Sequence, residues 1–147
     1  MKIEDEIKQE KFKSNNNKLF VNVIFTGNWI NQVTSRFLRK YGLTPQQYNI
    51  LRILRGQKPN PATIMLLQDR MLDRMSNASR LVDKLKGKNL VERKINGEDR
   101  RRVDVTITKK GMELLASIDK TNFEDKFANL SEAEAEKVNH LLDKMRG

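Results

Sequence analysis

The sequence has no cysteine, and this absence removes several classes of site at once. Without cysteine there is no disulfide, no thiolate zinc site and no thiol-based redox sensor. Histidine is almost as scarce: His140 is the only one, so a site built from several histidine ligands is excluded. We expect neither a metal nor a cofactor, and we interpret His140 as an exposed residue of the last helix without a special role.

Long apolar runs are also missing. No segment approaches the roughly 18 consecutive apolar residues typical of a membrane-spanning helix, and the charged, asparagine-rich N-terminus lacks the apolar part of a signal peptide. We therefore expect a cytoplasmic protein with no membrane partner. The sequence contains no glycine-rich phosphate loop and no histidine paired with a plausible nucleophile, which argues against an enzyme.

Positive charge is what the sequence has in excess. The net charge at pH 7 is +10, and residues 70–110 hold thirteen basic and six acidic residues, which places +7 of that total in one segment. Such a balance points to a polyanionic partner, although many basic proteins bind none, and its concentration in one segment points to a binding surface. At 147 residues the chain suits one domain or a compact two-part protomer.

Residues 76–88 have the pattern of an amphipathic helix. The apolar residues of this segment follow the spacing of one helical face, and the polar and charged residues fall on the other side. We expect a preceding helix that opens at Asn60-Pro61 and runs to about Arg70, then a short connection with Asp73 or Ser76 as the N-cap of the second helix. The apolar face of residues 76–88 consists of Ala78, Leu81, Val82 and Leu85.

After Asn89 the apolar period changes from about 3.6 to 2, which predicts a β-hairpin. Leu90 and Val91 lead into the first strand, and in the second strand apolar residues alternate with polar ones. The loop between them, residues 96–101, combines an Asn-Gly turn signal with consecutive arginines that no core could hold unpaired. We therefore expect a cationic tip in solvent. The apolar residues of the second strand are Val103, Val105 and Ile107.

These residues resemble the signature of a known family. The run Asp99-Arg100-Arg101, followed by VDVTIT at residues 103–108 and then Gly111, is similar to the D-x-R wing and the V-x-V-x-[LI]-T-x-x-G run of the MarR family of winged helix-turn-helix transcription regulators. The order of expected elements fits the family from Leu19 onward. Asn89 stands where the family usually places glycine, which is a mild departure because asparagine also tolerates the left-handed conformation.

The resemblance implies a mainly α fold with a small β-hairpin wing, divided into three parts. Residues 1–40 would form an N-terminal arm and a dimerisation helix. Residues 41–111 would form a winged helix-turn-helix DNA-binding domain, and residues 112–147 would form C-terminal dimerisation helices.

Caps and apolar periodicity predict the remaining helices. We expect a charged arm or frayed helix up to residue 18 and a long helix from Leu19 to about Arg39, ended by Gly42. A capping sequence, Thr44-Pro45-Gln46-Gln47, predicts the start of the next helix. Further helices are expected over residues 109–127 and after a second capping box at Ser131.

The resemblance implies that residues 76–88 form a recognition helix whose first turns enter the major groove of DNA. Arg80 is a candidate donor to guanine O6 and N7, and Asn77 is a candidate partner of adenine. The alternative is a solvated amphipathic helix with no partner. The remaining candidates are Ser76 and Ser79 for bases or phosphates, and Lys84 and Lys86 for phosphates.

In the wing, Arg101 matches the family's arginine that enters the minor groove, and Asp99 matches the acid that braces it. Narrow A·T-rich minor grooves concentrate negative potential and attract an inserted arginine, which is an independent physical reason for the same assignment. Arg100 and Arg102 would contact the flanking phosphates. The alternative is a hairpin tip that only keeps the protein soluble.

Phe25, Trp29, Phe37 and Tyr48 are open to two interpretations. Aromatic residues at helical spacing usually belong to a core. Members of the family, however, often bind small lipophilic or phenolic anions in a cleft between the dimer helices and the DNA-binding lobe, and release DNA in response. The same four residues are therefore candidates for an effector pocket, but no motif in the sequence names an effector.

As a whole, the resemblance implies a homodimer that represses or otherwise regulates transcription by binding double-stranded DNA at a pseudo-palindromic operator. Two alternatives stay open: a module that keeps the winged fold but binds protein, and an RNA-binding winged domain. The D-x-R tip favours DNA over the first. The second would show exposed stacking aromatics near the wing, and residues 76–111 contain no aromatic residue.

Overall fold

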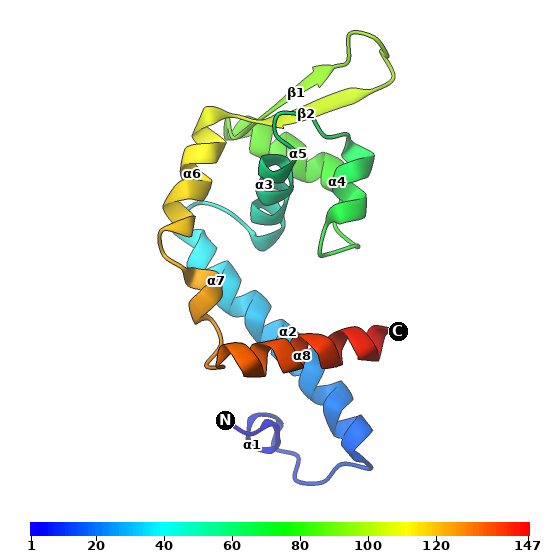
Figure 1. Cartoon of the computed structure of the whole chain (residues 1–147), viewed down its shortest axis with the longest axis vertical. Helices are drawn as coiled ribbons and strands as arrows, with labels where there is room; N and C mark the ends of the chain where they lie inside the picture. Colours follow the sequence, from blue (N-terminus) through cyan, green and yellow to red (C-terminus); the bar gives the residue numbers. More distant parts are fainter. The chain divides into compact units, whose positions relative to one another are not determined.

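The computed structural model describes residues 1–147 as two compact units, Met1–Met112 and Glu113–Gly147. The predicted fold class, mainly helical with one β-hairpin, is confirmed. In chain order the elements are α1 (Ile3–Ile7), α2 (Asn15–Arg39), α3 (Pro45–Gln57), α4 (Ile64–Arg70), α5 (Ala78–Gly87), β1 (Val91–Ile95), β2 (Val103–Ile107), α6 (Lys109–Asp119), α7 (Phe123–Lys126) and α8 (Glu132–Arg146) (Figure 1).

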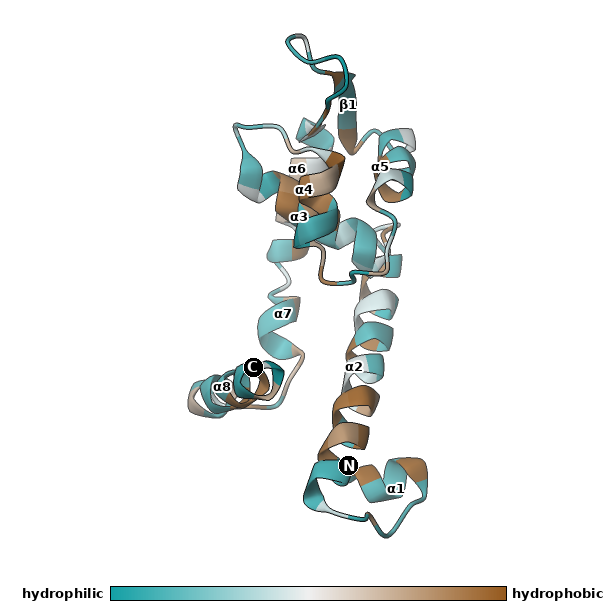
Figure 2. Cartoon of the chain, turned by 90° about the vertical axis from the view of Figure 1, so that its right-hand side faces the viewer, coloured by the Kyte–Doolittle hydropathy of each residue, from teal (hydrophilic) through white to brown (hydrophobic).

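The core of the first unit lies between α3, α4, α5 and the hairpin. Helix α3 packs against α2, α4, α5 and β2, and it has both hydrophobic and hydrophilic parts (Figure 2). Each fully buried aliphatic side chain contributes about 1.5–3 kcal/mol relative to an exposed one. The side chains less than 2% exposed in this core include Leu38, Ile50, Leu51, Leu54, Leu67, Val82, Leu85 and Val105.

The start of α3 confirms the predicted capping box. The Thr44 hydroxyl accepts a hydrogen bond from the Gln47 backbone N–H at 3.2 Å, and the Gln47 side-chain oxygen accepts one from the Thr44 N–H at 3.2 Å. Pro45 occupies the first helical turn. The Gln47 side chain is buried and also accepts a hydrogen bond from Lys88 Nζ at 3.1 Å, so the cap connects α3 to the end of α5.

Helix α2 begins four residues earlier than the sequence analysis predicted, at Asn15 rather than Leu19. Ser14 explains the difference, because its hydroxyl accepts a hydrogen bond from the Asn17 N–H at 3.1 Å and caps the helix. Within the preceding residues, α1 buries Ile3, and Glu4 forms an ion pair with Lys18 of α2. The first residues are therefore packed against α2 more closely than an arm would be.

The predicted start of the third helix at Asn60-Pro61 is wrong. Ala62 forms an isolated β-bridge with Val105, with N–H to carbonyl distances of 2.9 and 2.8 Å in the two directions. These bonds hold the chain extended through residue 62, so α4 begins only at Ile64. Thr63 is its N-cap, and its hydroxyl accepts a hydrogen bond from the Leu66 N–H at 3.1 Å.

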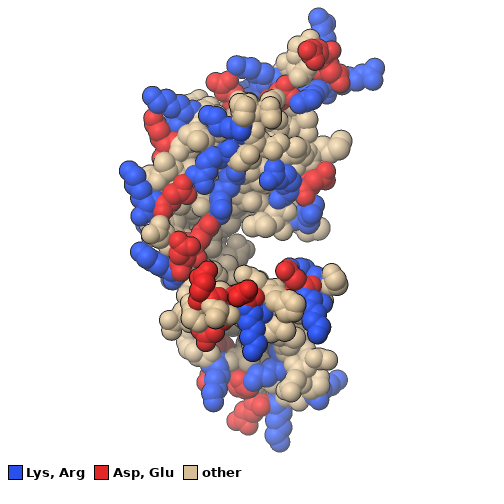
Figure 3. All heavy atoms as spheres, viewed as in Figure 1, with Lys and Arg blue, Asp and Glu red and all other residues tan.

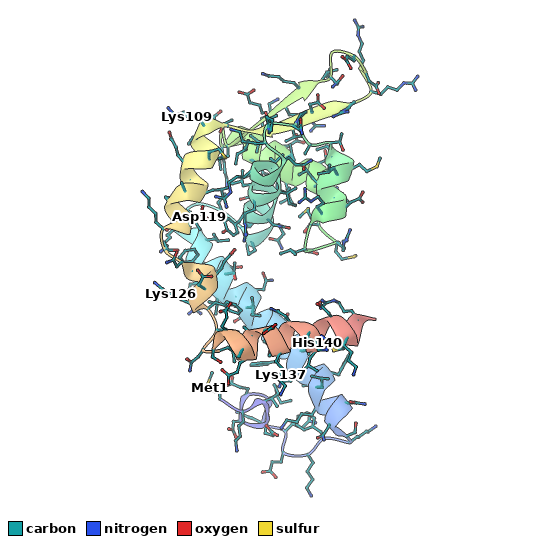
Figure 4. The ribbon with its side chains drawn as sticks, viewed as in Figure 1. Met1, Lys109, Asp119, Lys126, Lys137 and His140 are labelled. Atoms are coloured by element: carbon teal, nitrogen blue, oxygen red, sulfur yellow. The ribbon has the colours of Figure 1, made fainter.

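The single helix predicted over residues 109–127 is also wrong. The chain forms α6, whose ends Lys109 and Asp119 are labelled in Figure 4, and then the separate short helix α7. Asn122 has a left-handed φ of 48°, and the Thr121 hydroxyl donates to the Ile118 carbonyl at 2.7 Å, which satisfies a helix-end acceptor. The capping box of α8 is confirmed, with Ser131 and Glu134 bonded to each other reciprocally.

No helix of the structure combines the length and the apolar character needed to cross a bilayer.

Candidate nucleic-acid interface

Helix α5 begins at Ala78, two residues later than predicted, and its N-cap is Asn77 rather than Asp73 or Ser76. The Asn77 side-chain oxygen accepts a hydrogen bond from the Arg80 N–H at 3.0 Å. This bond uses an acceptor that a base could otherwise have taken, but it leaves the side-chain NH₂ of Asn77 as a donor.

The core fixes which face of α5 is exposed. Ala78, Val82 and Leu85 are at most 1% exposed, so the opposite side of the helix must face solvent. Arg80, Lys84 and Lys86 are all exposed, whereas Ser76 and Ser79 are half-buried. Arg80 and Lys84, four residues apart, therefore share the outward face, whereas Lys86 lies at its edge.

Gln68 of α4 ties the turn between α4 and α5 together. Its side-chain oxygen accepts a hydrogen bond from the Ala78 N–H at 3.0 Å, and its NH₂ group donates to the carbonyls of Ser76 at 2.8 Å and Arg74 at 3.3 Å. The sequence analysis missed this residue. A glutamine in the last turns of a short helix gives no periodic signal, and only the folded turn reveals its three partners.

Asp73 closes the same turn instead of capping α5. Its carboxylate accepts hydrogen bonds from the Ser76 hydroxyl at 2.8 Å, the Met75 N–H at 3.0 Å and the Gln46 side chain at 3.4 Å. These bonds hold the pKa of Asp73 below its ordinary value of 3.8, and the bond from the Ser76 hydroxyl contributes most. The hydroxyl of Ser76 is therefore engaged within the protein.

An ion pair connects α5 to the hairpin. Arg93 of β1 places Nη1 2.6 Å from Oδ1 of Asp83 in α5. The hairpin itself is antiparallel, with Val91 opposite Ile107 and Arg93 opposite Val105. Because one strand of the hairpin is bonded to α5, the two candidate DNA-contacting elements belong to one lobe.

The T-x-x-G part of the motif has a packing explanation. A Cβ on Gly111 would lie 2.5 Å from the Leu90 carbonyl oxygen and 2.7 Å from Ile107 Cγ1, so only glycine fits. The Thr108 hydroxyl accepts from the Gly111 N–H at 3.0 Å and donates to the Asn89 carbonyl at 2.8 Å. Asn89 adopts the left-handed conformation expected at this helix end, with φ of 59°.

The loop that joins β1 to β2 is one residue longer than the predicted residues 96–101. Gly97 does not adopt a positive φ, and the loop spans residues 96–102. The Asn96 side-chain oxygen accepts from the N–H groups of Glu98 at 2.9 Å and Asp99 at 3.0 Å. Asp99 in turn accepts from the Arg101 N–H at 2.9 Å, so the acid braces the backbone of the arginine.

The wing arginines are exposed, and Figure 3 shows Lys and Arg side chains projecting from the tip of the hairpin. Arg102 differs from its neighbours because its Nε lies 2.8 Å from Asp104 Oδ1. Part of its charge is therefore compensated within the strand. Arg100 and Arg101 lie at the tip.

The four residues of the tentative effector pocket have different surroundings. Tyr48 of α3 is buried at 9% exposure, with the Arg52 guanidinium 5.7 Å from its ring, while Trp29 of α2 is 38% exposed. Phe25 and Phe37 are half-buried, and the Phe37 ring lies 5.5 Å from that of Tyr41. No group of three or more acidic or histidine side chains could hold a metal ion, and His140 on α8 is exposed as predicted (Figure 4).

Comparison with known proteins agrees with this architecture. A model of the MarR family matches residues 41–102. The HTH-type transcriptional regulator MhqR of Bacillus subtilis (strain 168) is 29% identical over 131 residues, which cover 87% of this chain and 89% of that protein.

Two solved structures have similar folds. A MarR transcription factor from Planctomyces limnophilus superposes with a TM-score of 0.68 at 26% identity, covering 92% of this chain and 98% of the other. The S. aureus MepR–DNA complex gives a TM-score of 0.70 at 22% identity, covering 90% and 96%, and so shows a shared fold. Residues 41–102 therefore match the MarR family, whose members are transcription regulators and not enzymes, and the chain has the winged helix-turn-helix fold of the solved MarR protein that it resembles.

Proposed function

We propose that this regulator binds specific sequences of double-stranded DNA as a homodimer and represses transcription from a pseudo-palindromic operator. The observation that carries the proposal is the coexistence, in one lobe, of an outward basic helix face and a braced hairpin loop with arginines at its tip. Repression requires only that the bound dimer exclude other proteins from the promoter. Such a protein would act in the cytoplasm.

The proposed role of α5 is to read base edges in the major groove. Arg80 lies in the first turn of the helix, where recognition helices approach the bases, and its guanidinium fits guanine O6 and N7. Asn77 keeps a donor for a base after capping α5, and Ser79 is available to a base or a phosphate. Lys84 and Lys86 would contact phosphates, which carry affinity but no sequence information.

The proposed role of the wing is to place Arg101 in a flanking minor groove. The hydrogen bond from the Arg101 N–H to Asp99 supports this role, because it orders the backbone at the tip before DNA is present. Arg100 would contact a phosphate beside that groove. For Arg102 the same contact requires competition with Asp104, so we assign it a weaker contribution.

We assign dimerisation to residues 1–40 and 112–147, on either side of the DNA-binding residues 41–111. Large apolar side chains at both ends of the chain are exposed in the single protomer, and Figure 2 shows such residues in the N-terminal half of α2. Exposed apolar surface of this extent is typical of an interface. The side chains concerned are Leu19, Phe20 and Ile24 on α2, and Val138, Leu141 and Met145 on α8.

We further propose that a small lipophilic or phenolic effector releases the dimer from DNA. To do so the effector must bind better to a dimer whose recognition helices are wrongly spaced than to the DNA-bound form. Among the pocket candidates, Phe25, Trp29 and Phe37 are accessible enough to meet a ligand, whereas Tyr48 is largely buried. Trp29 is the only tryptophan, so its fluorescence reports directly on this region.

Selection of bound sequences from a pool of random duplexes tests the proposal. We expect an enriched inverted repeat whose half-sites lie about 10 bp apart, centre to centre, or a multiple of that spacing. A pool that shows no enrichment after repeated selection, while still binding at low salt, would contradict sequence-specific recognition. Enrichment of a single unrepeated site would contradict the homodimer.

A further inference from the structure

The turn between α4 and α5 exposes two large apolar side chains to solvent. Leu72 is 88% exposed and Met75 is 94% exposed, and the turn is flanked by the basic residues Arg70 and Arg74. Single exposed apolar residues are common and need no explanation. Met75, however, lies three residues before α5, beside the residues assigned to base contacts.

The backbone that carries Met75 is held from both sides. Its N–H donates to Asp73 at 3.0 Å, and the carbonyls of the adjacent residues, Arg74 and Ser76, both accept from Gln68. The Leu72 N–H donates to the Asn49 side chain at 2.9 Å. The turn therefore presents the Met75 side chain from an ordered backbone, and binding through it costs little backbone entropy.

Two of the polar groups beside Met75 are already used within the protein. The Ser76 hydroxyl donates to Asp73, and the Asn77 side-chain oxygen caps α5. What the turn offers to a partner in front of it is an unbranched, polarizable apolar chain. The charges of the turn itself balance, with Asp69 and Asp73 beside Arg70 and Arg74, so the polyanionic partner follows from the proposed function of the adjacent helix α5.

The major groove of DNA offers one apolar group to such a side chain, the 5-methyl group of thymine. We propose that Met75 is a specificity-determining residue that packs against a thymine methyl group at the edge of each half-site. This inference rests on the proposed function, because it requires α5 to lie in the major groove. Arg80 would recognise a base through hydrogen bonds, and Met75 would add a contact that needs none.

The test replaces thymine by deoxyuridine, which removes only the methyl group. Each thymine of the selected operator is exchanged in turn, and Kd is measured for wild type, Met75→Ala and Met75→Leu. For wild type we expect one position per half-site at which deoxyuridine raises Kd about fourfold, the contribution of one buried methylene-sized group. Met75→Ala should bind the thymine operator about as weakly as wild type binds the deoxyuridine one and show no further loss, whereas Met75→Leu should keep the discrimination.

Met65→Ala is the matched control. Met65 is also an exposed methionine, at 73%, but it lies in the first turn of α4 and not beside α5. It should discriminate thymine from deoxyuridine as wild type does, and both alanine variants should unfold at the wild-type temperature because neither side chain is buried.

Several results would overturn the inference. If Met75→Ala keeps full discrimination at that thymine, or if deoxyuridine costs wild type nothing at any position, Met75 does not read a methyl group. A Met75→Ala variant with altered oligomeric state and unchanged DNA affinity would assign the side chain to a protein contact instead. In each case wild type still binds its operator, so the proposed function stands; if wild type selects no operator, both fail together.

Discussion

At the scale of single residues, Asp73 and Asp99 accept hydrogen bonds from backbone N–H groups and uncharged side chains, whereas Asp83 and Asp104 pair with arginine side chains. Asp73 holds the turn before α5, and Asp99 holds the backbone of Arg101. Both are therefore positioning residues. Their effects are separable, because Asp73 orders the turn before α5 and Asp99 orders the hairpin loop.

Replacing Ser76 with alanine should raise the pKa of Asp73 towards 3.8, because the Ser76 hydroxyl makes the largest contribution to lowering it. The folded-state pKa is depressed, so the carboxylate stabilises the turn above pH 3.8 and loses this effect as the pH falls through its folded pKa. NMR titration of the Asp73 carboxyl carbon measures the shift. Ser79→Ala is the control and should leave that titration unchanged; an Asp73 curve that also does not move in Ser76→Ala would contradict the assigned cause.

Replacing Asp99 with alanine should weaken binding to operators with A·T-rich flanks by about 1 kcal/mol, the usual contribution of one hydrogen bond. Asp99→Asn should retain most of the affinity, since an amide oxygen can also accept from the Arg101 N–H. Fluorescence anisotropy with A·T-rich and G·C-rich flanks measures both variants. The bracing role is wrong if the two variants lose affinity equally, because the acceptor retained in Asp99→Asn would then make no difference.

At the scale of elements, sequence predicted what local chemistry determines. The α3 capping box, the left-handed Asn89 and the buried alternation of Val105 and Ile107 each depend on residues close in sequence. The predicted start at Asn60-Pro61 failed because Ala62 pairs with Val105, a partner far along the chain. Helix periodicity cannot register such a bond.

The residues of the candidate interface also fall into two groups, those that the nearby sequence predicts and those that depend on the folded turn. The basic residues of α5 were predictable because burial of Ala78, Val82 and Leu85 determines the outward face. The function of Gln68 was not predictable, because its partners meet it only after the turn has folded. The pairing of Arg102 with Asp104 was also missed, although the two residues stand at an alternating spacing that places them on one side of the strand.

Gly111→Ala should destabilise the lobe by about 1–3 kcal/mol, because the added Cβ would overlap the Leu90 carbonyl and the Ile107 side chain. Gly56→Ala is the matched control. It lies inside α3 with nothing within 4 Å of the added atom, so the same change there should stabilise by about 0.4–1 kcal/mol. Urea unfolding measures both. Equal midpoints for the two variants would show that the close approach at Gly111 is not significant for stability.

At the scale of the whole molecule, the exposed apolar residues on α2 and α8 predict that the protein is a dimer without DNA. Leu141→Glu should shift the protein towards monomer or make it insoluble, because a charge would be placed in the apolar interface. His140→Glu, a charge at the neighbouring exposed position, should leave the dimer intact. Sedimentation at micromolar concentration measures the oligomeric state of both variants and of wild type. A well-folded wild-type monomer would remove the basis for a two-fold operator.

The central claim is that α5 and the wing read DNA in different ways, and a competition titration of three variants tests it most directly. Arg80→Ala, Arg101→Ala and Lys84→Ala are compared on the operator, a flank-swapped operator and a random duplex, at two salt concentrations. Wild type on the same duplexes supplies the reference.

Arg80→Ala should lose about 1–3 kcal/mol on the operator and relax the preference at one base pair per half-site. Arg101→Ala should lose affinity mainly where the flanks are A·T-rich. Lys84→Ala should weaken all duplexes about equally and reduce the slope of log K against log salt by roughly one unit. Parallel losses by all three variants on every duplex would contradict the account, because α5 and the wing would then act only as a basic surface.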